Sequence, residues 1–408
     1  MTDVDEIPRF NAEFKADAQE RYARMRARGP IHPIRLVRGI DSWVVVDYEL
    51  ARTALTHPAL RQNSDPAQDA LEEAGSTLHH PETSLGVNML TTDPPDHTRL
   101  RRLVASAFTR RRMERLRPRV AEIAESLVDA FASPDVTGPG EVDLVEVFTG
   151  PLPITVISEL LGIPEASRPA FRAWTTQSMS SIGDRQREGF RHLNAFLAEL
   201  IADKRRSPGD DLLSALIGMH DQEDGRLSEA ELLGTANLLV VAGHDTTVNL
   251  MGNALIALFE HPDQLRRLRE APDLMPTAVE EFLRYDPSVE QTTMRYAVED
   301  LELGGTVIPR GGIVVVSLTS AARSDPALSE AERNTLDVER ANARHLSFGH
   351  GIHYCLGAPL ARIEAEIGLN TLLRRLPGLR PAVGRDELDW VPSGIMRGPI
   401  ALPVRFDR

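Results

Sequence analysis

The spacing of apolar residues divides the chain into a helical middle and flanking regions with short strands. From Asp96 to about residue 285, apolar positions recur mostly every three or four residues, which is the period of an amphipathic helix. Prolines and the turn signal at residues 207–210 punctuate this region. A helical pattern also covers residues 7–28, whereas residues 61–90 have little periodicity and predict a long loop.

Short strands are predicted on both sides of the helical middle. Runs of apolar and β-branched residues separated by glycine turns indicate strands at residues 34–37, 43–46, 301–303, 307–308 and 313–318. The fold class is therefore mainly α with small β-sheets. The helix-rich parts are expected at about 90–290 and 355–376, and the β-rich parts at about 30–60, 290–320 and 380–405, within one domain spanning residues 1–408.

Two helices matter for the chemistry that follows. Ser228 and Glu231 have the spacing of a capping box, and the apolar run after them predicts a helix that continues to about Glu260. At about 1.5 Å per residue this helix would be roughly 50 Å long. A last helix is predicted to begin near Pro359.

Composition narrows the class of protein. Hydrophobic residues make up 42% of the 408 residues and charged residues 26%, as in ordinary globular proteins. The 46 basic and 60 acidic residues give a formal charge of −14, which disfavours general nucleic-acid binding. One cysteine excludes an intrachain disulfide, a cysteine-rich zinc site and an all-cysteine iron–sulfur cluster held by this chain alone.

The pattern of apolar runs also sets expectations about location. The first ten residues are acidic and lack the apolar core of a signal peptide. Apolar runs of 18 or more residues are absent from the sequence, so we expect no membrane span and a cytoplasmic protein.

The single cysteine lies in a loop whose composition indicates a reactive thiol. Residues 348–357 read FGHGIHYCLG, with glycines that allow a tight turn and close approach of a flat ligand. Cys355 precedes the predicted last helix, where free N–H groups and the helix dipole favour the thiolate. Three interpretations remain open on these residues: a buried structural cysteine, a nucleophile paired with His350 or His353, and a metal ligand.

The same loop resembles the haem-binding loop of the cytochrome P450 family. Phe348, Gly351, Cys355 and Gly357 occupy every fixed position of its pattern, Phe, two residues, Gly, three residues, Cys, one residue, Gly. The resemblance extends over nearly the whole chain and is nearest to actinobacterial enzymes that hydroxylate macrolides and other polyketides. It implies the cytochrome P450 fold and a haem b (iron protoporphyrin IX) whose axial metal ligand is the Cys355 thiolate, which favours O–O bond cleavage.

A second motif lies in the middle of the predicted long helix. Residues 242–247 place one glycine and two threonines in a helix interior, and the glycine alone costs about 1 kcal/mol. A helix kink with threonine hydroxyls bonded to preceding carbonyls would explain this without any chemistry. The segment resembles the oxygen-activating motif of the family. By that resemblance Ala242 and Gly243 leave room at the haem, Thr246 hydrogen-bonds the oxygen to be cleaved, and Asp245 relays protons.

Basic residues at helical spacing are candidates for haem carboxylates. His97 and Arg101 are four residues apart and share one helix face, which for most such pairs is simply solvated. The family resemblance assigns them, with Arg295 and His353, to the haem propionates, and arginine suits this task because its fork binds a carboxylate bidentately. The implied cofactor-binding set is His97, Arg101, Ala242, Gly243, Arg295, Phe348, Gly349, His353, Cys355 and Gly357.

Glu281 and Arg284 are three residues apart on a predicted helix. Alone, this spacing indicates an ordinary surface ion pair worth about 0.3–0.5 kcal/mol. By the resemblance it is the Glu-x-x-Arg pair of a structural triad that holds the cysteine loop. Arg340 aligns best with the third member, with Arg344 as the alternative.

The sequence contains no glycine-rich dinucleotide fingerprint, so electrons must come from another protein. Residues 99–119 carry nine arginines in an acidic chain. This run fits a solvated helix face, or by the resemblance a docking site for an acidic ferredoxin served by an NAD(P)H-dependent reductase. A nucleic-acid patch is disfavoured because no aromatic residues are interleaved.

The motifs together imply a monooxygenase, expected as a monomer. The resemblance implies hydroxylation or epoxidation of a macrolide or polyketide, as in antibiotic biosynthesis, using O2 and two electrons. A peroxide-driven peroxygenase and a non-catalytic haem protein of the same fold are the alternatives, and a cysteine hydrolase is more remote. By analogy, the substrate-contacting residues are expected at 61–90, 175–185, Val240, Val241, 289–293 and 394–396.

Overall fold

The computed structural model describes residues 14–15, 17–36, 39–73, 85–132, 140–178, 183–220 and 227–407. Contacts divide the chain into two compact units. Unit 1 comprises Met1–Ser76, Asn253–Cys355 and Gly384–Ile400, and unit 2 comprises Thr77–Gly252, Leu356–Val383 and Ala401–Arg408. Each unit is described by itself, and the expectation of one domain over residues 1–408 stays a prediction.

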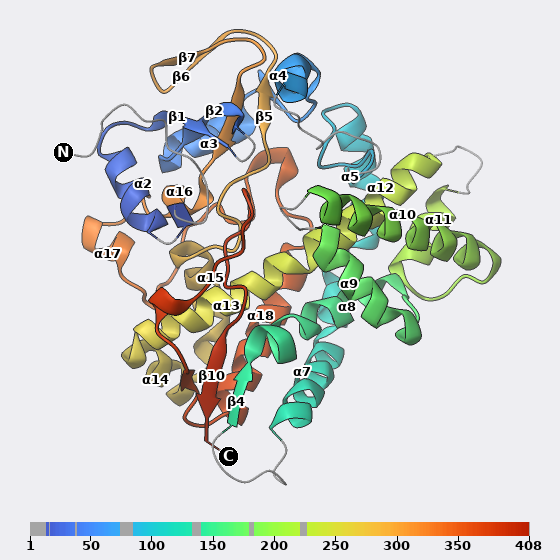
Figure 1. Cartoon of the computed structure of the whole chain (residues 1–408), viewed down its shortest axis with the longest axis vertical. Helices are drawn as coiled ribbons and strands as arrows, with labels where there is room; N and C mark the ends of the chain where they lie inside the picture. Colours follow the sequence, from blue (N-terminus) through green and yellow to red (C-terminus); the bar gives the residue numbers. More distant parts are fainter. Residues whose placement is uncertain are drawn as a thin grey trace. The chain divides into compact units, whose positions relative to one another are not determined.

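Unit 1 is built on a five-stranded sheet (Figure 1). Its strands, in spatial order, are β1 (Ile31–Arg35), β2 (Asp41–Val45), β8 (Ile313–Val316), β5 (Arg295–Ala297) and β3 (Leu60–Arg61). Only the β2–β8 pair is parallel, with Val45 opposite Val316. β-branched and aromatic residues in these short runs pack well on a pleated surface, which is why the predicted strands are confirmed.

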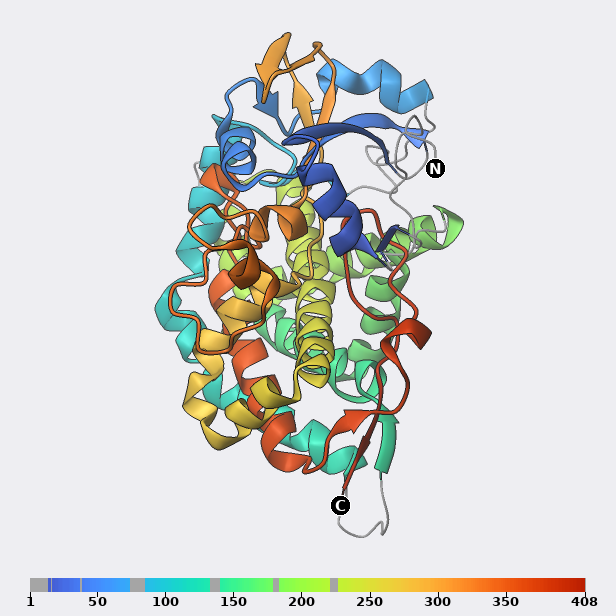
Figure 2. The same cartoon turned by 90° about the vertical axis from the view of Figure 1, so that its left-hand side faces the viewer.

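Short helices cover this sheet, and a two-stranded hairpin of β6 (Leu301–Leu303) and β7 (Thr306–Ile308) extends from it (Figure 2). The predicted loop at 61–90 is partly wrong, because it contains the short helix α4; residues 74–84 lie outside the described residues. The helices of unit 1 are α2 (Ala18–Arg26), α3 (Tyr48–Thr56), η2 (Asp65–Ala67), α4 (Gln68–Glu73), α14 (Pro262–Glu270), η5 (Pro272–Leu274), α15 (Met275–Tyr285), α16 (Leu318–Ala322), α17 (Glu330–Asn334), η6 (Gly351–His353) and η7 (Arg385–Glu387).

Unit 2 is a helical assembly with one small sheet of β4 (Gly140–Asp143), β10 (Pro403–Phe406) and β9 (Arg380–Pro381). A side chain at Gly140 would collide with the Phe406 ring, so glycine is needed there. The helices of unit 2 are α5 (Asp96–Ala107), α6 (Arg110–Glu114), α7 (Arg117–Phe131), the π-helix η3 (Val145–Thr149), α8 (Pro151–Leu161), η4 (Glu165–Ser167), α9 (Arg168–Ser178), α10 (Gly183–Arg206), α11 (Leu212–His220), α12 (Glu229–Gly243) and α18 (Ala358–Arg375).

The predicted continuous helix from residue 228 to 260 is wrong in its middle. The capping box is confirmed, since the Ser228 and Glu231 side chains each accept the other residue's backbone N–H. The helix breaks at His244, whose φ of −103° and ψ of −80° separate α12 from α13 (Asp245–Glu260). Gly243, a weak helix former, precedes the break, and the Thr246 hydroxyl binds the Ala242 carbonyl.

Among the described residues, the search for membrane-spanning helices found none of sufficient length and apolar character.

Candidate active site

The Cys355 loop in unit 1 turns twice on glycines. Gly349 and Gly351 have φ of 74° and 75°, a left-handed conformation that residues with a side chain rarely adopt. The Cys355 N–H donates to the Phe348 carbonyl at 2.8 Å, and the Gly349 N–H donates to Leu346 at 2.7 Å. The tight turn predicted from the glycines is therefore confirmed, and it holds Cys355 three residues before α18.

Neighbouring elements of unit 1 hold the loop in place. A side chain at Gly351 would come within 2.8 Å of Thr56 Cγ2 on α3, so the loop lies directly on that helix. The Ser347 hydroxyl donates to the Leu283 carbonyl of α15 at 2.5 Å. Cys355 itself is half-buried, which does not fit the interpretation of a fully buried structural cysteine.

An ion cluster on α15 supports the same region. Arg284 binds Glu281 through two hydrogen bonds of 2.7 Å, and both side chains are 0% exposed. Arg340 Nε donates to Glu281 at 3.1 Å, whereas Arg344 pairs with Asp325 at 3.2 Å. The third member of the predicted triad is therefore Arg340. The distances also exclude an ordinary surface pair at Glu281.

The ion cluster also clamps the chain that leads to the cysteine loop. Arg284 donates to the carbonyls of Arg333 and Thr335, each at 2.9 Å, and Arg340 donates to Glu332 at 3.0 Å. Fixing these carbonyls to α15 fixes the path of the chain that runs on to the loop.

Two predicted propionate partners lie in unit 1. Arg295 begins β5 in the middle of the sheet opposite Val314, and only 5% of it is exposed. His353 ends η6, two residues before Cys355, and is half-buried. A buried guanidinium in a sheet is costly unless an anion accompanies it, which suits a carboxylate ligand.

The other two predicted propionate partners lie on α5 in unit 2. His97 is 1% exposed, Arg101 is half-buried one turn later, and the His97 N–H donates to the Asp93 carbonyl at 3.0 Å. Burial lowers the pKa of His97, and the charge of Arg101 lowers it further against the opposing effect of Asp93. The His97 ring is thus held neutral near pH 7, while Arg101 carries the charge.

The acid–alcohol motif lies at the break between α12 and α13 in unit 2. The Thr246 hydroxyl donates to the Ala242 carbonyl at 2.7 Å, so its oxygen keeps lone pairs for a second partner. His244 Nδ1 lies 3.1 Å from Asp245 Oδ1, and 24% of the Asp245 side chain is exposed. A side chain at Gly243 would crowd Ile157 at 3.3 Å. The break therefore exposes an acid next to a hydroxyl.

One further acid beside this motif was missed by the sequence analysis. Glu364 of α18 is fully buried in unit 2 and hydrogen-bonds the side chain of Thr247. Burial raises the pKa of Glu364 well above its ordinary value, so the carboxyl is neutral at pH 7. The signal available in the sequence was an acid flanked by Ile363 and Ala365 on an otherwise apolar stretch.

The basic run at 99–119 divides into two groups. Arg99, Arg117 and Arg119 are engaged in ion pairs with Glu231, Glu366 and Glu159. Arg102 and Arg111 are exposed and Arg112 is half-buried, and none of them forms an ion pair among the described residues. The side chain of Arg110 lies outside the described residues. Part of the run is therefore an internal ion-pair set, and part is an open basic surface.

Comparison with known proteins settles the family. The family profile described as Cytochrome P450 matches residues 168–381. The chain belongs to the cytochrome P450 family. It is 48% identical over 407 residues to the cytochrome P450 monooxygenase PikC of Streptomyces venezuelae, covering 99% of this chain and 95% of PikC.

Other P450 relatives are similar over their full length. The 6-deoxyerythronolide B hydroxylase of Saccharopolyspora erythraea is 41% identical over 416 residues, with 100% of both chains covered. The mycinamicin IV hydroxylase/epoxidase of Micromonospora griseorubida is 40% identical, with 94% of each covered. The tirandamycin C-bound P450 monooxygenase TamI has a TM-score of 0.89 at 38% identity, over 98% of this chain and 100% of TamI.

Family membership confirms the predicted fold class and enzyme class. The protein is a P450 monooxygenase, related to macrolide and polyketide hydroxylases. A P450 implies a haem with a cysteine thiolate ligand. The residues fit such a group, because the single thiol follows a fixed loop and buried cations are present for carboxylates.

Proposed function

We propose that the protein binds haem b through the Cys355 thiolate and inserts one oxygen atom of O2 into a macrolide or related polyketide. The observation that supports this most strongly is the Cys355 loop, with its two left-handed glycines and the 2.8 Å bond from the Cys355 N–H to Phe348. That bond fixes the backbone and therefore the direction of the sulfur. Gly349 and Gly357 belong to the same loop, and Phe348 would shield the sulfur.

The haem propionates are assigned to four basic residues. His97 and Arg101 follow one face of α5, and Arg295 and His353 come from unit 1. The arginines would supply charge, and neutral His97 would supply a hydrogen bond, because burial lowers its pKa.

The haem, when bound, supplies the centre at which two electrons reduce O2. The chain's own part is delivery of protons. The Thr246 hydroxyl is held by the Ala242 carbonyl and orients a hydrogen bond, and partly exposed Asp245 can exchange protons with water. Ala242 and Gly243 keep the adjacent space free of large side chains.

We expect Thr246→Ala to lower the product formed per electron pair by about tenfold or more, within the range for a positioned proton-transfer group. Oxygen consumption continues, because the alanine still leaves the haem accessible, but reduced oxygen is released as peroxide. The measurement is the ratio of product to NAD(P)H consumed, with Thr246→Ser as the control that keeps the hydroxyl.

The same variant pair separates the proposal from a peroxygenase. If hydrogen peroxide alone drives turnover at full rate and a reductase with NAD(P)H adds nothing, the peroxygenase is correct. A result in which alanine and serine behave alike would remove Thr246 from proton delivery.

Electrons are proposed to come from a ferredoxin and its NAD(P)H-dependent reductase. The open basic surface of Arg102, Arg111 and Arg112 supports an acidic partner, because these residues are not engaged in the ion pairs that absorb Arg99, Arg117 and Arg119. Opposite charges raise the association rate in a salt-dependent way.

Replacing Arg102, Arg111 and Arg112 with glutamine should lower turnover at limiting ferredoxin by about tenfold or more and flatten its salt dependence. The control replaces Arg187, Arg191 and Arg206, three exposed arginines of α10, and changes the charge equally. Equal loss in both triple variants would show a general charge effect and contradict the dock.

The substrate class is supported by the relatives, since PikC-like hydroxylases act on large polyketide-derived molecules by their names. The test is a spin-state titration of the haem-loaded enzyme against macrolides, 6-deoxyerythronolide B and tirandamycin C. Binding without product formation in the presence of ferredoxin and reductase would favour the non-catalytic alternative.

A further inference from the structure

Four charged side chains are buried together in unit 1, apart from the Glu281 cluster. They are Lys15, Asp286, Glu290 and Arg397, with side-chain exposures of 2%, 9%, 1% and 1%. Two cations and two anions make the set neutral overall. Removal of one partner from such a set leaves an uncompensated buried charge, which is strongly destabilising. The cluster therefore has to be held together.

Lys15 is the member that bridges segments far apart in the sequence. Its ammonium donates to the carbonyls of Val391, at 3.2 Å, and Met396, and lies 3.7 Å from the Glu290 carboxylate. The residue precedes α2, so one side chain from the start of the chain contacts both the region after α15 and the loop before β10.

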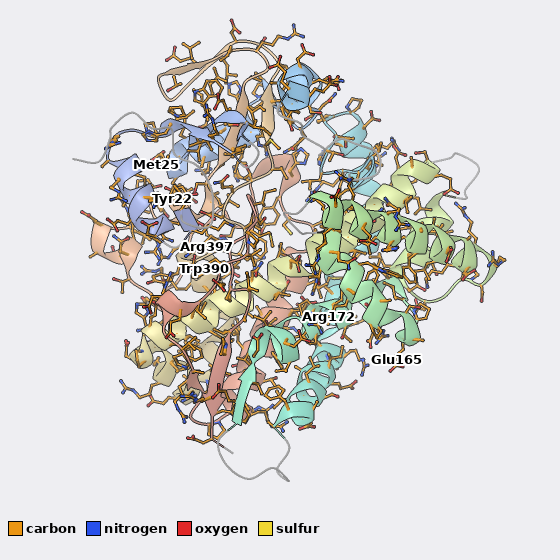
Figure 3. The ribbon with its side chains drawn as sticks, in the orientation of Figure 1. Tyr22, Met25, Glu165, Arg172, Trp390 and Arg397 are labelled. Atoms are coloured by element: carbon orange, nitrogen blue, oxygen red, sulfur yellow. The ribbon has the colours of Figure 1, made fainter. Side chains whose placement is uncertain are left out.

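Arg397 closes the cluster from the other side. Its Nε donates to Asp286 at 2.7 Å and another nitrogen donates to the Lys15 carbonyl at 2.7 Å. Its guanidinium stacks 4.3 Å from the centre of the Trp390 ring, and Figure 3 labels both residues together with Tyr22. The Tyr22 hydroxyl donates to Glu290 at 3.1 Å.

The segments joined by Lys15 also pair through their backbones. The Glu290 N–H donates to Ile395 and the Arg397 N–H donates to Ser288, each at 2.8 Å, around a bridge between Val289 and Met396. These residues overlap the two segments proposed for substrate contact, 289–293 and 394–396. The lysine lies on the carbonyl side of the same pairing.

The rarity of lysine makes the choice at this position specific. Of the 46 basic residues, only Lys15 and Lys204 are lysines. Both are buried, and Lys204 is 2.6 Å from Asp211. Arginine serves everywhere on the described surface, so lysine is kept where a compact ammonium group, which can lose its proton, replaces a wide guanidinium.

We infer that Lys15 is a positioning residue for substrate binding: its ammonium group locks residues 288–291 against residues 395–397, and loss of its charge loosens this lock. The inference rests on the proposed function only in assigning substrate contacts to these two segments.

The lock depends on pH in a defined direction. Burial lowers the pKa of Lys15 from 10.5 to about 8, with Arg397 also lowering it and Glu290 opposing, and burial raises the pKa of Glu290. The groups that face Lys15 are Glu290 and Arg397, with Asp286 and Tyr22 behind them. Above about pH 8 the amine is neutral and Glu290 has lost its cation.

Protein stability does not fall in the same pH window. The unfolded chain holds the lysine proton up to about pH 10.5, so between pH 8 and 10.5 it binds more protons than the folded chain. The contribution of Lys15 to the free energy of unfolding therefore rises with pH in this window. A weaker substrate affinity there is not a consequence of unfolding.

The experiment compares three forms of the haem-loaded enzyme with the unaltered one. They are Lys15→Met, the double variant Lys15→Met/Glu290→Gln, which restores neutrality, and the control Arg24→Met/Glu20→Gln, an exposed pair on α2. The readouts are the spin-state affinity for 6-deoxyerythronolide B as probe, at pH 7 and 9, and hydrogen exchange of peptides covering 288–291 and 395–397.

Lys15→Met should weaken probe binding by about tenfold, equivalent to about 1.4 kcal/mol, and speed exchange in both peptides. The double variant should recover both and lose the weakening between pH 7 and 9. Exchange in Lys15→Met equal to that of the control, or equal losses in the single and double variants, would overturn the lock. If the probe does not bind the unaltered enzyme, the proposed substrate class fails for this probe, and exchange alone still decides the lock.

Discussion

Cys355→Ser abolishes the thiolate signature and lowers monooxygenase turnover by more than about 100-fold, because even outer partners of a metal ligand contribute about 10–100-fold. Serine keeps the size of the side chain and the 2.8 Å backbone bond to Phe348, so the loop is preserved. Its hydroxyl stays protonated near pH 7 and cannot donate charge to iron as a thiolate does. Turnover with ferredoxin and reductase, measured against haem content, gives the effect per bound haem.

The matched control is His350→Gln in the same loop. A cysteine nucleophile would need a histidine base, so this variant would impair a cysteine hydrolase. The haem-ligand account predicts an unchanged spectrum and turnover for His350→Gln. Loss of activity in the histidine variant with unchanged haem binding in the serine variant would contradict that account.

Glu281→Gln is expected to destabilise the protein by about 3–5 kcal/mol, because it leaves the fully buried Arg284 with an uncompensated charge. The amide also loses one acceptor shared by Arg340 and the Asp337 N–H. Since Leu283 on the same helix anchors the loop through Ser347, haem retention falls together with stability. Urea denaturation followed by fluorescence and by haem absorbance measures both.

The control for this prediction is Glu339→Gln, which breaks an exposed pair of the same type. Arg267 and Glu339 lie 2.7 Å apart and are about half exposed, so the expected change is below about 1 kcal/mol. Equal changes in the two variants would show that the Glu281 cluster is no more important than a surface pair.

The sequence predicted best those features whose residues are close together in the chain. The Cys355 loop needs only its glycines to turn, and the Ser228 capping box needs only four residues. Both were found before the structure and are confirmed. The short strands followed for the same reason, since β-branched runs fit a pleated surface whatever their partners.

Features that depend on tertiary packing could not be predicted. Arg340 and Arg344 are equally plausible by spacing, and only the path of the chain near α15 selects Arg340. Glu364 and Lys15 look like ordinary surface charges, because their burial comes from helices and loops distant in sequence. The break at His244 was missed because helix propensity falls by only about 1 kcal/mol at Gly243.

The reduced carbon monoxide difference spectrum of the unaltered protein tests the central claim most directly. A haem with the Cys355 thiolate as axial ligand predicts the long-wavelength band of thiolate-ligated iron, which is lost in Cys355→Ser. A band at the shorter wavelength of histidine-ligated haem in fully folded protein, or colourless protein that cannot be reconstituted with haem, would contradict the account.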